Sequence, residues 1–291
     1  MKLEDINIRD PFVLVHNGRY YLYGTRAIHT WTQEIKDGYG FDVYESDDLV
    51  NWSEPKSIFE KDDSFWGEYH FWAPEVHKYN GKFYLLATFD SRNAHKGTAI
   101  LECDKPNGTF KVHSEGNVTP KDWKCLDGTL YVDNGIPYMV FCHEWTQISD
   151  GEICYVQLSK DLKRAVGEPR TMLKASHGKP WVVPHDGLNS YVTDGPFMVN
   201  VDGELVCLWS SFGKDGYVEA LARSNNGKID GEWSIDKELL FEKNGGHGMV
   251  FKDLDGSFNF VYHTPNETPF ERPCIRKIEK EVLKKDNGDA T

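Results

Sequence analysis

Carboxylate and imidazole side chains recur at similar places along this chain of 291 residues. Asp10, Asp127 and Asp194 each stand at the start of a short strand-like run, and His247 opens a later run. Carboxylates that share one site repel each other, so that one releases its proton easily while another retains it. Such a set suits general acid–base chemistry, in which one group donates a proton and another accepts one. An aspartate at a strand start is also a common turn residue, so each of them alone has an equally good structural interpretation.

A second group of side chains lies near these strand starts: four stand at or just after the ends of the strands that would lie beside them, and Trp72 directly precedes the start of the second hairpin. The residues of this group expected to bind substrate are Arg26, Trp72, His143, Trp145 and His263. Trp72 and Trp145 could stack on a flat apolar face of a ligand such as a sugar ring. Trp31, Trp66 and Phe71 could extend these walls. Packing between sheets is the more frequent role of any single aromatic residue.

Five hairpin-like segments position these residues. Each has an apolar or alternating run, then Asn-Gly or Asp-Gly, and then a second run rich in aromatic residues. The segments are DPFVLVHNGRYYLYGTR, APEVHKYNGKFYLLATF, DGTLYVDNGIPYMVFCH, DGPFMVNVDGELVCLWSS and HGMVFKDLDGSFNFVYH. Asn-Gly and Asp-Gly favour a type I′ turn, because that turn needs a positive φ at both central residues. The turn glycines follow one another at intervals of 53 to 68 residues, which indicates an internal repeat.

Further strand-like segments follow four of the hairpins. They cover residues 41–52, 98–110, 153–163 and 218–233. A repeat of roughly 60 residues with three or four antiparallel strands is typical of a β-propeller blade. The sequence therefore predicts an all-β, five-bladed β-propeller, a single domain over residues 1–291 whose blades begin near residues 10, 73, 127, 194 and 247. A β-sandwich would explain the strands but not the repeat. Because the innermost strands of a propeller begin on one face, we expect the three aspartates and His247 to meet in one central pocket.

The composition excludes several classes of protein. The chain has 33 basic and 46 acidic side chains, a net charge of −13, so we expect no nucleic-acid partner. No run approaches 18 apolar residues, so we expect no membrane span. The six cysteines are scattered and no signal peptide is visible, which predicts free thiols and a cytoplasmic location, although a processed secreted chain would look the same. The oligomeric state is left open.

Five short motifs carry a resemblance to a known family. In blade order they are Arg9-Asp10-Pro11, Trp72-Ala73-Pro74, Asp127-Gly128-Thr129, Asp194-Gly195-Pro196 and Gly246-His247-Gly248. Together they resemble glycoside hydrolase family 43, over about residues 5–275. That family consists of five-bladed β-propeller enzymes that cleave glycosidic bonds with inversion, chiefly α-L-arabinofuranosidases, β-xylosidases and arabinanases.

The resemblance implies a role for each polar motif residue. Asp10 resembles the general base that activates water, and Asp127 resembles the carboxylate that orients the general acid and tunes its pKa. His247 resembles the histidine near a structural cation on the propeller axis, usually calcium held largely through water. The family commonly has Glu at the fourth motif, where this chain has the shorter Asp194. Glu144, expected beside Asp127, is therefore a second candidate for the general acid.

These features predict an inverting glycoside hydrolase of plant-type oligo- or polysaccharides. We expect an α-L-arabinofuranosidase or a β-xylosidase that acts on chain ends and needs no cofactor for its chemistry. Acids on different blades suit the separation of about 6.5–9.5 Å that leaves room for the attacking water. The alternative is a carbohydrate-binding propeller without catalysis, which would gain nothing from three converging carboxylates.

Overall fold

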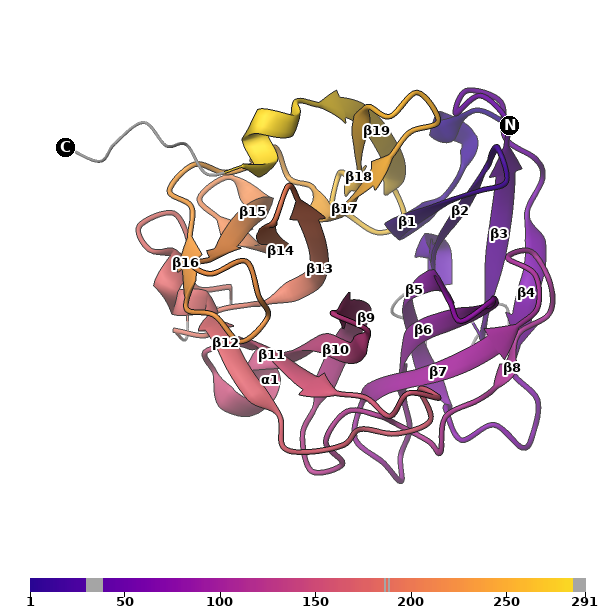
Figure 1. Cartoon of the computed structure of the whole chain (residues 1–291), viewed down its shortest axis with the longest axis horizontal. Helices are drawn as coiled ribbons and strands as arrows, with labels where there is room; N and C mark the ends of the chain where they lie inside the picture. The colour runs from indigo at the N-terminus through magenta and orange to yellow at the C-terminus, as the bar shows by residue number, and fades with distance from the viewer. Residues whose placement is uncertain (30–38, 186, 188, 285–291) are drawn as a thin grey trace.

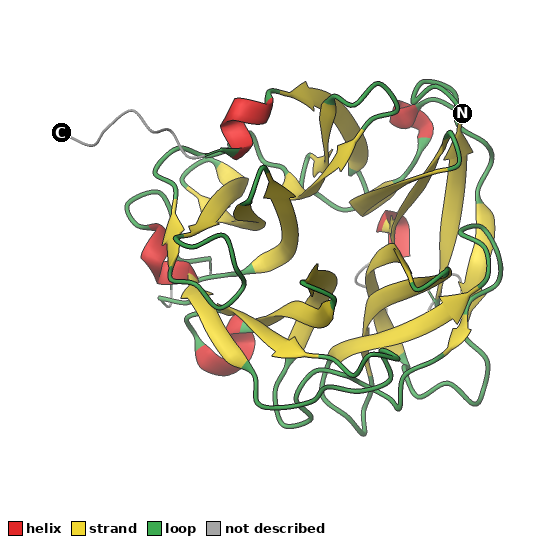
Figure 2. Ribbon diagram, viewed as in Figure 1, coloured by secondary structure: helices red, strands yellow, loops and turns green. Residues whose placement is uncertain are grey.

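The computed structural model describes residues 1–29, 39–185, 187 and 189–284. Its strands form five antiparallel sheets around a central axis, with β1, β5, β9, β13 and β17 innermost (Figure 1). In each sheet, the strands follow one another in chain order from the axis outwards. The helices in the described part of the chain are short segments in the connections between strands (Figure 2). The chain has the all-β fold that its sequence predicts, a five-bladed β-propeller.

The first three blades have four strands each. Blade one consists of β1 (Ile8–His16), β2 (Arg19–Arg26), β3 (Gly40–Ser46) and β4 (Lys56–Glu60). Blade two consists of β5 (Tyr69–Tyr79), β6 (Lys82–Asp90), β7 (Gly97–Cys103) and β8 (Lys111–Val112). Blade three consists of β9 (Cys125–Asp133), β10 (Ile136–His143), β11 (Glu152–Gln157) and β12 (Arg170–Lys174).

Among the described residues, blade four has four strands and blade five has three. Blade four consists of β13 (Asp194–Val201), β14 (Glu204–Gly213), β15 (Gly216–Ser224) and β16 (Trp233–Ile235). Blade five consists of β17 (Gly246–Lys252), β18 (Phe258–Thr264) and β19 (Arg272–Ile278). The described helices are η1 (Leu3–Asp5), η2 (Ala27–His29), α1 (Trp145–Ile148), η4 (Ala175–Gly178) and η5 (Lys280–Leu283). The strands expected within 41–52, 98–110, 153–163 and 218–233 are β3, β7, β11 and β15.

Four of the five innermost hairpins turn as predicted. Both central residues have a positive φ at Asn17-Gly18, Asn80-Gly81, Asn134-Gly135 and Asp202-Gly203. The prediction of a type I′ turn is wrong at the fifth hairpin, where Gly256 but not Asp255 has a positive φ. There the chain makes a longer loop, closed by a hydrogen bond from the Asp253 amide to the Ser257 carbonyl at 2.8 Å.

Each innermost strand carries a bulge near its beginning. At the bulge, pairing with the second strand shifts register and one residue adopts a positive φ. These bulge residues are Asp10 (53°), Ala73 (47°), Asp127 (56°), Gly195 (51°) and His247 (50°). Asp194 therefore precedes its bulge, whereas Asp10 and Asp127 occupy theirs. The expectation that the three aspartates hold equivalent places is wrong by one residue at Asp194.

A cluster of aromatic residues lies between blades one and two. A cluster of five phenylalanines has ring centroids 4.8 to 6.3 Å apart; its members are Phe41, Phe59, Phe65, Phe71 and Phe89. Trp66 packs against this core, so the expectation that Trp66 and Phe71 form a ligand wall is not supported. Trp31 lies outside the described residues.

Polar contacts close the ring between blades five and one. Asn7 Nδ2 donates to the carbonyl of Pro269 at 2.6 Å, and Arg272 Nε donates to the carbonyl of Glu4 at 2.9 Å. Within residues 1–29 and 39–284, as far as they are described, blade one and blade five share no strand. The closure therefore depends on side chains from the two blades.

Two further expectations concern the chain as a whole. No helix in the described ranges is long and apolar enough to cross a membrane. All six cysteines are free thiols, as predicted.

Candidate active site

The bulges surround one pocket of about 500 Å³ on the propeller axis. Asp10, Asp127, Asp194 and His247 all line it, as the repeat predicts. The residues that immediately precede the first three bulges, Arg9, Trp72 and Leu126, line the same pocket. At the bulges of blades one and three, two successive side chains thus face the same space, which an uninterrupted strand does not allow because its side chains alternate between faces.

Asp10 is held by charged and polar neighbours. Its carboxylate lies 3.2 Å from Arg9 Nε and 3.2 Å from His247 Nδ1. It also accepts a hydrogen bond from Thr25 Oγ1 at 2.6 Å. Burial alone would raise the pKa of Asp10, but His247 and Arg9 outweigh burial and hold this pKa well below its usual range. Asp10 is therefore an ionised carboxylate at neutral pH.

His263 supports Asp10 from beneath the pocket. It is completely buried, and burial together with Arg9 lowers its pKa to about 3. The ring is therefore neutral at neutral pH. Its Nδ1 accepts the Asp10 amide at 3.2 Å, and Nε2 lies 3.1 Å from Asn266 Oδ1, which fixes the proton on Nε2.

Asp127 and Asp194 have the opposite electrostatic character. Burial and the charge of Asp10 raise the pKa of Asp127 to about 8. Burial and the charge of Asp127 raise the pKa of Asp194 to about 7. Tyr217 Oη donates to Asp194 Oδ2 at 3.0 Å and thereby orients the carboxyl group. The pocket thus combines one carboxylate that readily stays ionised with two carboxyl groups that retain protons.

The amide of each bulge residue is held by a neighbouring side chain. At three junctions the acceptor is a hydroxyl on the second strand of the preceding blade: Thr25 for Ala73 (2.7 Å), Thr88 for Asp127 (2.8 Å) and Ser210 for His247 (2.6 Å). We call this second-strand position the junction position. At the junction of blades five and one, it is occupied by His263.

The junction of blades three and four lacks such an acceptor. Its junction position is Cys142, paired with Leu126 as Thr25 is paired with Arg9. A thiol is a weak acceptor, and the amide of Gly195 donates instead to Asp127 Oδ2 at 3.0 Å. A Cβ on Gly195 would lie 2.7 Å from the His247 ring, so only glycine fits at this bulge. The backbone therefore holds Asp127 directly.

Aromatic rings form two walls of the pocket. Trp72 stacks on His70 with centroids 4.1 Å apart. Phe212 stacks on His185 at the same separation, and Trp145 meets the edge of His185 at 5.5 Å. Trp72 and Trp145, both expected from the sequence, thus line the pocket.

Glu144, the second candidate acid, also lines the pocket. Its Oε1 accepts a hydrogen bond from Lys96 Nζ at 2.8 Å, and both side chains are buried. The same ammonium group lies 4.5 Å from the centroid of Trp72. Protonation of Glu144 would break this buried ion pair and leave the Lys96 charge without its partner. Asp194, in contrast, can be protonated without breaking an ion pair, because its partner is the neutral hydroxyl of Tyr217.

Three of the expected substrate-binding residues lie elsewhere. Arg26 forms ion pairs with Asp42 and Glu60 and is not among the described residues that line the pocket. His143 is buried, stacks on a tryptophan ring and lies 3.0 Å from Gln147 Oε1. His263 acts on Asp10, as described above. Arg26 is kept out of the pocket by its ion pairs, His143 by its stacking partner, and His263 by its complete burial.

Sequence reasoning missed several residues that shape the site. Tyr217 reaches Asp194 from β15, and Lys96 reaches Glu144 from the loop after β6. Glu219 is fully buried; its Oε2 accepts hydrogen bonds from Ser210 Oγ at 2.6 Å and the Gly248 amide at 3.0 Å, which steadies the His247 bulge. Burial raises the pKa of Glu219 to about 8. A buried acid in the apolar run VEALA was the one available signal.

Comparison with known proteins identifies the family. Residues 5–281 match the model of glycosyl hydrolases family 43. The chain belongs to this family. Its resemblance to family 43, inferred from five motifs, is thereby confirmed, and the chain is a family 43 glycoside hydrolase.

A solved structure and two curated relatives that this family 43 chain resembles are named for related activities. The endo-arabinase from Bacteroides thetaiotaomicron is 39% identical, with a TM-score of 0.87 over 96% of each chain. The extracellular exo-alpha-(1->5)-L-arabinofuranosidase ArbA of Cellvibrio japonicus is 24% identical over 86% of this chain and 72% of its own length. The extracellular endo-alpha-(1->5)-L-arabinanase 1 of Bacillus subtilis is 27% identical over 48% of this chain and 45% of its own length, so that match spans about half of each protein. Because these two relatives are named extracellular, the cytoplasmic location stays a prediction.

The calcium expected near His247 can be compared with the residues present. Calcium takes six to eight oxygen ligands. Within the described ranges, no group of three or more His, Cys, Asp and Glu residues is arranged to hold a metal ion. His247 Nδ1 faces Asp10. The side chains alone do not fit a calcium site, so the structural cation stays a prediction that depends on water ligands.

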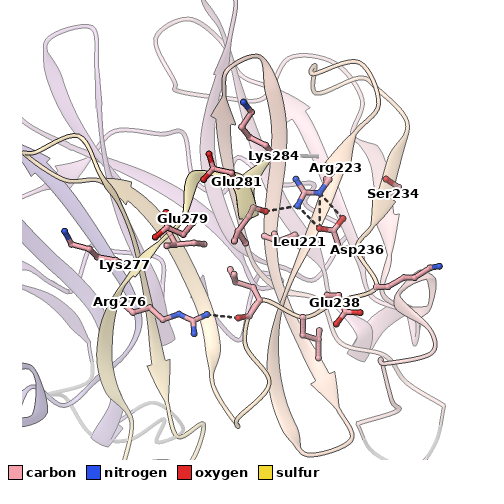
Figure 3. A pocket seen from close by; sticks show the side chains of 15 residues that line it. Leu221, Arg223, Ser234, Asp236, Glu238, Arg276, Lys277, Glu279, Glu281 and Lys284 are labelled. Carbon is pink, nitrogen blue, oxygen red and sulfur yellow. Dashed lines mark hydrogen bonds and ion pairs between the residues drawn. The ribbon is translucent and has the colours of Figure 1, made fainter. Parts of the chain in front are cut away.

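A larger hollow of about 810 Å³ lies on the outer side of blades four and five (Figure 3). Its arginines are already engaged. Arg223 is bound by Asp236 and the Val282 carbonyl, and Arg276 donates to the Leu240 carbonyl. Since its strongest donors are occupied by the protein, this hollow is a junction between blades and not the active site.

Proposed function

We propose that this family 43 enzyme hydrolyses α-L-arabinofuranosyl bonds with inversion at the anomeric carbon. The observation that supports this most is that one pocket holds two carboxyl groups with opposite pKa shifts: Arg9 and His247 lower the pKa of Asp10, and burial raises the pKa of Asp194 to about 7. Arabinan is favoured as the substrate because the 39% identical structure is named an endo-arabinase and two further relatives are named for α-(1->5)-L-arabinosyl substrates.

Asp10 is the general base in this proposal. Its ionised carboxylate takes a proton from a water molecule, whose oxygen then attacks the anomeric carbon. Arg9 and His247 stabilise the ionised form before the reaction and hold the carboxylate in place. Thr25 fixes the second oxygen atom through its hydroxyl.

Asp194 is the general acid. A carboxyl group with a pKa of about 7 still carries its proton near neutral pH and can give it to the departing glycosidic oxygen. Asp127, which raises that pKa when it is itself ionised, is oriented by the Gly195 amide. The shorter Asp reaches the pocket because it precedes the bulge, where the backbone already turns toward the axis. The bond between the water oxygen and the anomeric carbon forms as the bond between that carbon and the glycosidic oxygen breaks. Water gives one proton to Asp10, and Asp194 gives one proton to the leaving group.

A panel of nitrophenyl glycosides tests the proposal. We expect hydrolysis of the α-L-arabinofuranoside and release of single arabinose units from linear arabino-oligosaccharides. NMR of the first product formed should show the inverted anomer. Fast hydrolysis of the β-xyloside alone would favour the second candidate, a β-xylosidase. This candidate is supported by the relative from Humicola insolens, which is named xylosidase/arabinosidase 43A. Binding of arabinan without any hydrolysis would favour the non-catalytic carbohydrate-binding propeller.

A further inference from the structure

The pocket opens into a groove of about 690 Å³ between blades two and three. His70, Lys96, Glu144 and Thr146 line both the pocket and the groove, so the two spaces are continuous. A glycan whose terminal unit occupies the pocket can therefore place its following units in the groove. The groove is made by the loop after β6 and by the segment that leads into β9.

The groove is basic in an acidic protein. Arg92, His95, Lys121 and Lys124 line it, with Lys96 at the boundary to the pocket. Within the part of the chain that the structure describes, the side chains of Arg92, Lys121 and Lys124 form no ion pair or hydrogen bond. The whole chain, in contrast, has a net charge of −13. Unpaired cations beside a binding pocket raise the local concentration of anionic ligands.

The acids of the groove are mostly engaged. Asp90 Oδ2 lies 3.0 Å from His70 Nδ1, and its Oδ1 accepts the Ser91 amide at 2.8 Å. Glu144 is paired with Lys96. Of the acids that line the groove, this leaves Asp122 to offset the positive charges of Arg92, Lys121 and Lys124.

We propose that this groove binds an anionic sugar unit, a uronic acid, on the leaving-group side of the scissile bond. The inference rests on the proposed function and names a substrate class for it: arabinosyl chains attached to, or interrupted by, uronic acids. A ligand that must also enter the pocket is a glycan, and the carboxylate is the anionic group that a sugar unit itself can carry. Lys121 and Lys124 are the principal partners of this carboxylate, and Arg92 can bind it with two hydrogen bonds.

The test compares three oligosaccharides of the same length. One is neutral, one has a uronic acid on the leaving-group side, and one has the methyl ester of that uronic acid. An exposed lysine–carboxylate pair contributes about 0.2–1 kcal/mol, which corresponds to roughly 1.5- to 5-fold in affinity for each pair. For the wild-type enzyme at low salt, we expect kcat/KM to be about 3- to 10-fold higher for the acid than for its methyl ester. This ratio should approach one in high salt, because exposed charges are screened.

The Lys121→Gln/Lys124→Gln double variant should lose this preference and keep its rate on the neutral substrate. The matched control is Lys105→Gln/Lys111→Gln, which removes two exposed lysines of blade two outside the groove and should keep the preference. A wild-type ratio of one, or a ratio that the double variant leaves unchanged, would overturn the proposal. A sulfated oligosaccharide preferred over the uronic acid would overturn it too and assign the groove to sulfate esters. Hydrolysis of the neutral substrate tests the proposed function separately. If the wild-type enzyme did not hydrolyse it, the proposed glycosidase activity would be contradicted, whatever the groove binds.

Discussion

The junction of blades five and one and the junction of blades three and four both lack the hydroxyl that holds the bulge amide elsewhere. At the first, the His263 imidazole accepts a hydrogen bond from the Asp10 amide, and the Asp10 carboxylate contacts Arg9 and His247. At the second, Cys142 provides no strong acceptor, and the Asp127 carboxylate takes the Gly195 amide itself. The blade-one bulge therefore holds an ionised Asp10, whereas the blade-three bulge holds a proton-retaining Asp127 whose carboxyl group also accepts the bulge amide of blade four. The neighbours of the bulge, more than the bulge itself, decide the chemistry of its aspartate.

Removal of the charge at the first junction should have the largest effect. Asp10→Asn keeps the shape and can still accept the Thr25 hydroxyl, but it cannot take a proton from water. We expect kcat to fall about 10²- to 10⁴-fold while the fold is kept, because such losses are usual for a general base. Steady-state kinetics and circular dichroism check this expectation. A variant with a tenth or more of the wild-type rate would exclude Asp10 as the base.

Removal of the acid at the second junction should depend on the leaving group. Asp194→Ala should slow arabino-oligosaccharides severely but spare aryl arabinosides whose leaving group is a strong acid, since these depart with little protonation. Asp10→Ala should spare neither substrate. Rates on dinitrophenyl and natural substrates measure the difference.

Glu144→Ala is the matched control for this assignment. It should damage both substrate types similarly, because it disrupts the Lys96 pair at the mouth of the groove. Rescue by a good leaving group in Glu144→Ala, but not in Asp194→Ala, would make Glu144 the proton donor.

Conversion of the second junction to the common pattern should shift the pH profile. In the wild type, activity should persist at acidic pH, where Asp10 is still ionised, and fall above about pH 7 as Asp194 loses its proton. In Cys142→Ser the new hydroxyl can accept the Gly195 amide, and Asp127 then loses a hydrogen bond that lowers its pKa. A more protonated Asp127 repels Asp194 less, so the alkaline limb of the profile should move to lower pH.

Cys142→Ala serves as the control for this shift, because alanine offers no acceptor and should leave the Gly195–Asp127 bond intact. The pH dependence of kcat/KM distinguishes the two variants. Equal profiles for Ser and Ala at this position would show that the junction position does not influence the acid.

The smallest effect concerns stability. The folded-state pKa of Asp194 is raised from 3.8 to about 7, so the folded protein binds a proton here that the unfolded chain releases. This contribution to stability is complete below about pH 4 and is lost as pH rises to about 7. Asp194→Asn removes the titration, and its melting temperature should exceed that of the wild type by several degrees at pH 8 and match it at pH 4. An equal difference at both pH values would contradict this account.

The repeat and the central pocket could be predicted because they depend on local turn chemistry. Asn-Gly and Asp-Gly pairs specify the hairpins, and the hairpins specify which strand starts face the axis. The offset of Asp194 could not be predicted, because a bulge leaves no mark in the alternation of a short strand. Tyr217 and Lys96 were missed for another reason: their partners come from other strands or blades, and which side chains meet there depends on the twist of each sheet.

The expected role of Arg26 shows the same limit. Its place at a strand end was read correctly, since β2 ends at Arg26. Asp42 and Glu60 on the next two strands, however, bind its guanidinium. A charge in a pattern can be assigned to a site only when its nearest opposite charges are known.

The closure of the ring has a consequence for how this enzyme responds to heat. Arg9 spans the closure, with one contact to Asp10 and another, at 3.4 Å, to the buried Glu271. If blades five and one separate locally, Asp10 loses His263, His247 and the orientation of Arg9 together, while every sheet stays intact. Turnover should therefore stop at a temperature where the circular dichroism spectrum is still that of the folded propeller, and cooling should restore it. The temperature at which activity is lost therefore measures the separation of blades five and one, and not the unfolding of the propeller.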